Sequence, residues 1–78
     1  MMAKVFVTLK RGVLDPQGQA VARSLARLGF DEVKDARIGK YIELKLDGDR
    51  AAAEKRLKEM CERLLANTVI EEYRYEIE

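Results

Sequence analysis

The chain has 78 residues, of which 47% are hydrophobic and 37% are charged, and this composition excludes a disordered chain and a membrane protein. Its 15 basic and 14 acidic residues leave a net charge of +1, too small an excess for a partner held mainly through phosphates. We therefore expect one small domain, residues 1–78. It should need burial against other chains, because so small a core barely offsets the entropy of folding.

The chain is poor in the residue types that an enzyme usually needs for catalysis. The chain has no histidine, the usual proton-transfer group and metal ligand near neutral pH. Its one cysteine, Cys61, cannot form an internal disulfide and suits a reducing compartment. The apolar run at the N-terminus is too short for a signal segment or a membrane span. We expect no catalytic residue and no metal site in this chain, a cytoplasmic location, and neither nucleic acid nor membrane as partner.

The first half of the chain predicts a strand, a helix and a second strand. Residues 4–10 alternate between apolar and polar, which is typical of a strand with one buried face. Asp15 as N-cap and Pro16 at the first helical position predict the start of a helix, and Gly29 predicts its end. The stretch 30–38 is then expected to be extended.

The second half predicts two strands around a second helix. Gly39 and Lys40 fit a two-residue type II′ hairpin turn before a third strand over 41–46. The apolar spacing from Ala53 to Leu64 predicts a helix, and residues 69–78 alternate as a last strand. The order β-α-β-β-α-β predicts an α+β, ferredoxin-like sandwich, with a four-stranded antiparallel sheet and both helices on one face.

This fold would leave one sheet face open, with Phe6 and Tyr41 on adjacent central strands. Three interpretations remain. The aromatics are ordinary surface residues shielded by charged neighbours, or a surface for self-association or docking, or a platform for RNA bases. The last is the weakest, because residues 39–44 lack the aromatic RNA-recognition pattern and Glu43 would repel phosphate.

Two loops and one cysteine are the remaining candidates. The loop 10–18 combines cations, glycines and a helix N-terminus, which can hold an anion, but Asp15 already supplies a negative charge there. An acylphosphatase-like site would also need an asparagine on the third strand, and residues 40–46 contain none. Residues 37–40 form either a solvated turn or a contact for a partner that bears carboxylates. Cys61 on the apolar stripe predicts inert packing.

Four segments together resemble one family: K-x-G-V-L-D-P-Q-G at 10–18, L-G-F at 28–30, V-x-x-x-R-x-G-K at 33–40 and M-C-x-x-L-L-A-N-x-V-I-E at 60–71. This set resembles the small PurS-type subunit of phosphoribosylformylglycinamidine synthase, over almost the whole chain. Arg11 and Thr68 stand where that family usually has proline, and neither change removes a charged or catalytic group.

The resemblance implies a non-catalytic subunit of an ATP-dependent, glutamine-hydrolysing ligase of purine biosynthesis. It implies the ferredoxin-like fold and three kinds of partner: a glutaminase subunit that releases ammonia, a large synthetase subunit, and other copies in a dimer or tetramer. ATP and magnesium are expected on the large subunit, and this chain itself is expected to bind no cofactor. As a hypothesis, the chain joins the other two subunits so that ammonia passes between them.

The loops 10–18 and 37–40 are the parts of the matched motifs that the fold needs least, and Phe6 and Tyr41 lie on the open face. We therefore expect contacts with partners or other copies at Phe6, Lys10, Gly12, Asp15, Pro16, Gly18, Arg37, Gly39, Lys40 and Tyr41. The alternative is a dimeric ligand-sensing module similar to the ACT domains, in which Gly12 would lie beside a bound amino acid. Calorimetry with amino acids would favour that alternative, and salt-dependent binding of single-stranded RNA would favour the RNA platform.

Overall fold

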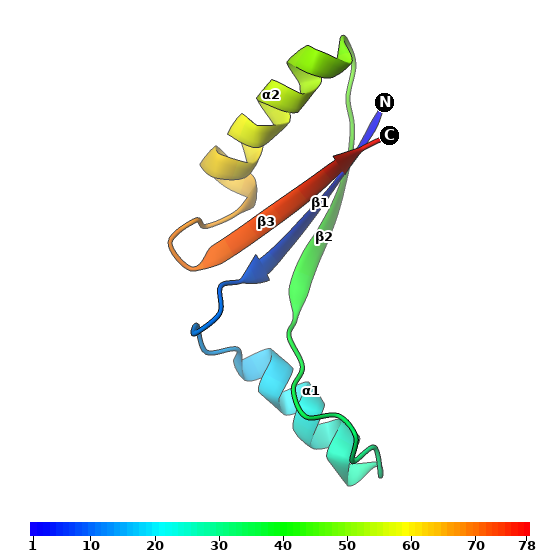
Figure 1. Cartoon of the computed structure of the whole chain (residues 1–78), viewed down its shortest axis with the longest axis vertical. Helices are drawn as coiled ribbons and strands as arrows, with labels where there is room; N and C mark the ends of the chain where they lie inside the picture. The colour runs from blue at the N-terminus through cyan, green and yellow to red at the C-terminus, as the bar shows by residue number, and fades with distance from the viewer.

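The computed structural model describes all 78 residues and contains a three-stranded antiparallel sheet, one helix packed on the sheet and a second helix that projects away from it (Figure 1). The strand order is β2-β1-β3. In chain order the elements are β1 (Met2–Leu9), α1 (Pro16–Arg27), β2 (Gly39–Lys45), α2 (Arg50–Met60), the π-helical turn η1 (Cys61–Leu65) and β3 (Glu71–Ile77). Neither α1 nor α2 has the length and the apolar run that crossing a membrane requires.

The central strand β1 fixes which residues share each face. Val5 lies opposite Ile42 in β2 and opposite Tyr75 in β3. Successive side chains of a strand point to opposite faces, so these three residues share the face that α2 covers. The alternate positions point to the other, open face: the even-numbered residues of β1 and β3 and the odd-numbered residues of β2.

The core lies between the sheet and α2. Leu57 of α2 is fully buried together with Val5 and Val7 of β1, and Cys61 continues this layer into η1. The core cluster contains no residue of α1. The prediction of an amphipathic second helix that packs on the sheet is confirmed.

The predicted ends of α1 are also confirmed. The carboxylate of Asp15 accepts a hydrogen bond from the Gly18 amide at 2.8 Å, as an N-cap does. At the other end Gly29 has φ = 98°, and its amide donates to the Ala26 carbonyl at 3.1 Å. The next amide donates to the Leu25 carbonyl at 3.0 Å, which completes a Schellman motif.

The sheet has three strands, so the prediction of four is wrong. Residues 30–38 pair with no strand, and no turn separates them from β2. Gly39 lies opposite Thr8 within β2, and its φ lies outside the left-handed region. A Cβ atom on Gly39 would lie 2.4 Å from the Val7 carbonyl oxygen. Glycine is therefore required by the close approach of β1, and the predicted type II′ turn is a misassignment.

The prediction that both helices cover one face is wrong as well. Figure 1 shows α2 alongside the sheet and α1 pointing away from it beyond one end. The molecule is 49 Å long, and its radius of gyration is 15.9 Å, against about 11–12 Å for a compact chain of this length. We call α1 and the returning residues 28–36 the arm, and the sheet with α2 and η1 the body.

Candidate functional site

The predicted contact residues fall into two groups. One group surrounds the junction between arm and body, which we call the elbow (residues 9–18 and 36–40). The other group is the aromatic pair on the open face. The elbow brings together most of the predicted residues, namely Lys10, Gly12, Asp15, Pro16, Gly18, Arg37, Gly39 and Lys40.

Asp15 is the central residue of the elbow. It is only 8% exposed, and its two carboxylate oxygens serve different segments. Oδ1 accepts from the Gly18 amide at 2.8 Å, and Oδ2 accepts from the Ile38 amide at 2.9 Å. These bonds, that of Ile38 first, hold the pKa of Asp15 below its usual value. One side chain thus joins the start of α1 to the residue that precedes β2.

Arg37 makes a second link across the elbow. Its guanidinium donates to the backbone carbonyl oxygens of Leu9, at 2.6 Å, and Lys10, at 3.1 Å. The returning segment is therefore fastened to the end of β1. The sequence indicated only a solvated cation or a partner contact at Arg37, because side-chain bonds to a distant backbone leave no pattern in the sequence.

Gly18 allows the closest approach within the elbow. A Cβ atom built on Gly18 would lie 2.1 Å from the Ala36 carbonyl oxygen and 2.9 Å from the Asp15 carboxylate. Real Cβ atoms do not come this close to a backbone oxygen. Any other residue at position 18 would push α1 away from the returning segment.

A cleft of about 210 Å³ opens at the elbow between the ends of the strands. Asp15 and Lys40 are among its lining residues, as is Glu71 at the start of β3. The ammonium group of Lys40 lies 3.9 Å from the Glu71 carboxylate. The other oxygen of that carboxylate accepts a hydrogen bond from the backbone amide of Asn67 at 2.7 Å. Lys40 is thus partly engaged within the chain, whereas Gly12 and Pro16 are exposed.

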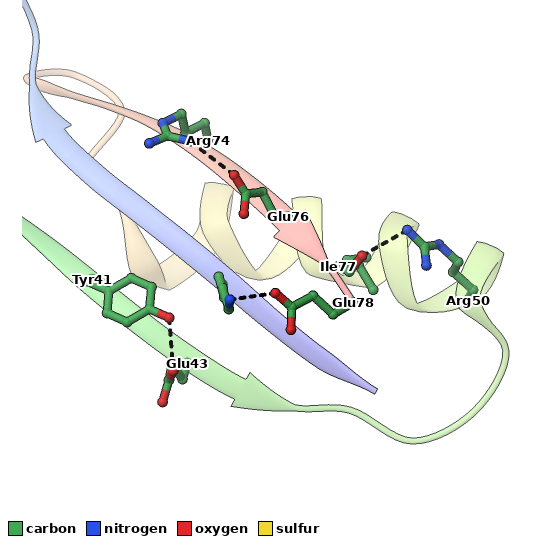
Figure 2. Close-up of polar contacts among 8 residues, drawn as sticks. Tyr41, Glu43, Arg50, Arg74, Glu76, Ile77 and Glu78 are labelled. Carbon is green, nitrogen blue, oxygen red and sulfur yellow. Dashed lines mark hydrogen bonds and ion pairs between the residues drawn. The ribbon is translucent and has the colours of Figure 1, made fainter.

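The aromatic pair on the open face forms as predicted, with the ring centroids of Phe6 and Tyr41 5.1 Å apart. The Arg74 guanidinium lies over the Phe6 ring, 4.1 Å from its centroid. No local pattern in the sequence predicts this place for Arg74, because it depends on the register of β3. The Tyr41 hydroxyl donates to Glu43 at 2.9 Å, which raises the pKa of the tyrosine (Figure 2).

The charges of the open face are interlaced. Lys4 pairs with Glu78 at 2.5 Å, which raises the pKa of the lysine. Arg74 pairs with Glu76 at 3.4 Å (Figure 2). The register places three cations and four carboxylates here: Lys4, Lys45, Arg74, Glu43, Glu72, Glu76 and Glu78. A surface with more carboxylates than cations repels phosphates, so this face does not favour the RNA platform.

The arm carries an uncovered apolar surface that sequence analysis did not anticipate. Leu28, at the C-cap of α1, is 73% exposed. Large apolar side chains are also exposed elsewhere along the arm and its base, at Leu14, Val21, Phe30 and Ile38. The pattern of α1 correctly indicated an apolar stripe, but no residue of that stripe packs on the core of the chain's own sheet. Several large apolar side chains exposed on one segment indicate an interaction site.

Comparison with known proteins gives one consistent result. The family model for PurS, phosphoribosylformylglycinamidine (FGAM) synthase, matches residues 2–78. The phosphoribosylformylglycinamidine synthase subunit PurS of Bacillus subtilis (strain 168) is 56% identical over 75 residues, covering 96% of this chain and 89% of that protein. The PurS subunit of Synechocystis is 55% identical over 75 residues, covering 95% and 75%.

Solved structures agree with the sequence comparison. The structure of B. subtilis PurS matches with a TM-score of 0.89 at 55% identity, over 99% of this chain and 96% of that chain. A chain in the structure of PurLQS from Thermotoga maritima matches with a TM-score of 0.75 at 29% identity, over 97% and 96%. The structural similarity extends over nearly the whole chain and therefore includes the residues of the projecting arm.

Proposed function

The chain belongs to the PurS family and is the PurS subunit of phosphoribosylformylglycinamidine synthase in purine biosynthesis, and on that premise we propose that it bridges the other subunits of the complex. The bridge would hold a glutaminase subunit against a large synthetase subunit so that ammonia passes between them. Ammonia that enters bulk water is diluted and protonated, so a fixed, short path would raise the yield of the coupled reaction. The structure of PurLQS from Thermotoga maritima, which contains a similar chain, supports a role within such a complex.

The observation that carries the proposal is the uncovered arm. A helix whose apolar side chains reach solvent adds little stability to its own body and gains most by packing on another chain. We propose a second copy of this chain as the occupant, in a dimer or tetramer. Exchange of an identical element between copies is a low-cost route to such an oligomer, since each copy then both supplies and receives an arm.

The proposed oligomer leaves two surfaces of the chain for contacts with the other subunits of the complex. If the arm serves the oligomer, the open face with Phe6 and Tyr41 and the exposed residues Gly12 and Pro16 of the elbow are available to the other subunits. We further propose that ATP and magnesium bind the large synthetase subunit and that this chain supplies no catalytic group. The shifted pKa values of Asp15, Lys4 and Tyr41 support this, because each follows from a bond within the chain itself. A complex that consumes ATP and glutamine fits the cytoplasm.

The test is reconstitution of the synthase from the purified synthetase and glutaminase subunits of the same organism. Adding this chain should restore synthesis that depends on glutamine, whereas synthesis supported by ammonium salts should proceed without it. The measurement is product formation with each nitrogen source, with and without the chain. Full coupling of glutamine hydrolysis to synthesis in the absence of the chain would refute the bridge.

A further inference from the structure

The arm leaves the body through two chain crossings, residues 10–15 outward and residues 36–39 on return. If these crossings were loose, the arm would sample many directions, and any partner would have to order it upon binding. Such ordering costs free energy at the moment of association. The way in which the two crossings are tied together therefore bears directly on how well the arm can dock.

Asp15 ties the two crossings with a single carboxylate. Its oxygens accept from Gly18, in the first turn of α1 directly after the outward path, and from Ile38, 23 residues away on the return path. Both oxygens face backbone N–H donors. An asparagine could serve one of these donors, but its amide nitrogen would then face the other, because that nitrogen cannot accept a hydrogen bond.

Two further contacts restrict the same joint. Arg37 fastens the return path to the carbonyl oxygens of Leu9 and Lys10 at the end of β1. Gly18 allows α1 to lie against the Ala36 carbonyl, where a Cβ atom would lie only 2.1 Å from the oxygen. The first turn of α1 and the return path are thus held together by a charge-assisted bond pair and by a contact that only glycine permits.

We infer that the elbow is a rigid joint that sets the direction of the arm, and that Asp15 and Gly18 are positioning residues on which docking of the arm to a second copy depends. This inference rests on the proposed oligomer and adds which residues prepare the arm for it. Because the core lies wholly within the body, damage to the elbow should weaken association while the body stays folded.

Two variants and two controls test the inference. Asp15→Asn removes the acceptor for one amide while keeping an equally good N-cap, and Gly18→Ala forces α1 away from the return path. Asp49→Asn makes the same chemical change at the N-cap of α2, where the side chain accepts only from the Ala52 amide. Arg23→Ala truncates an exposed side chain of α1 on the side of the helix opposite to Val21 and Leu28.

The readouts are the molar mass by light scattering over a dilution series and amide hydrogen exchange. The elbow variants should raise the dissociation constant by about tenfold or more, the fold-change expected when at least one residue of a loosened arm must be ordered upon association. Exchange should accelerate at the amides of Gly18 and Ile38, while amides of β1 and α2 stay protected. Both control variants should assemble as the unaltered chain does.

The outcomes separate this inference from the proposal beneath it. An unaltered chain that stays monomeric would overturn the proposed oligomer and the elbow together. An oligomeric chain whose elbow variants associate within twofold of normal would overturn the elbow alone. Loss of protection in β1 and α2 of the elbow variants would also overturn it, because the elbow would then be part of the folding core.

Discussion

Truncation of Leu28 discriminates between a free arm and a docked one. In the isolated chain this side chain is 73% exposed, so Leu28→Ala should cost less than about 0.5 kcal/mol. Burial of the same leucine against another copy would raise the cost to about 2–5 kcal/mol. A symmetric dimer contains two such contacts, so even the lower figure gives about 4 kcal/mol, or roughly a thousandfold in the dissociation constant.

Sedimentation equilibrium or light scattering over a dilution series measures that constant directly. Arg23→Ala, which truncates an exposed side chain on the opposite side of the same helix, provides the matched control and should leave the constant unchanged. Thermal unfolding of Leu28→Ala at low concentration should match that of the unaltered chain, because the body keeps its core. A change of less than about threefold in the dissociation constant would refute the packing of the arm on a second copy.

Four other results are expected. Leu57→Ala, which truncates a fully buried core residue, should lower the free energy of unfolding in urea by about 2–5 kcal/mol, and a loss below about 1 kcal/mol would contradict the described core. Arg74→Ala removes an exposed cation–π contact with Phe6 and should cost no more than about 1 kcal/mol in the same assay. Burial raises the pKa of the Cys61 thiol, so iodoacetamide at about pH 8.5 should modify the folded chain far more slowly than the unfolded chain, and equal rates would mean that the core opens readily. The amide bonds to Asp15 lower its pKa, so its carboxyl should titrate by NMR below the ordinary value of 3.8; their stabilisation is present above that value and is lost as the pH falls through the depressed pKa.

Local features of the fold were predictable because they depend on neighbouring residues. The alternation in β1, the cap at Asp15 and the helix end at Gly29 each follow from short-range geometry, and the structure confirms them. The pairing of Phe6 with Tyr41 also followed, since the strand order made their strands neighbours. These are the cases in which the sequence pattern has only one good structural solution.

The predictions failed where one sequence pattern is compatible with two different structures. Glycine at position 39 suits a tight turn, but it equally suits a strand that approaches its neighbour too closely for a Cβ atom. The apolar stripe of α1 indicates that the helix must be covered, but a stripe does not specify whether the cover belongs to the same copy of the chain. The bonds of Arg37 to the backbone of Leu9 and Lys10 join distant segments and could not be inferred from spacing.

The strand β1 has two independent sides. Val5 and Val7 are buried beneath α2, while Phe6, which lies between them in the sequence, is on the open face beneath the Arg74 guanidinium. Every second residue of this strand can therefore diverge during evolution without disturbing the hydrophobic layer. Single substitutions at these alternate positions can change which proteins the open face binds, while the hydrophobic core stays intact.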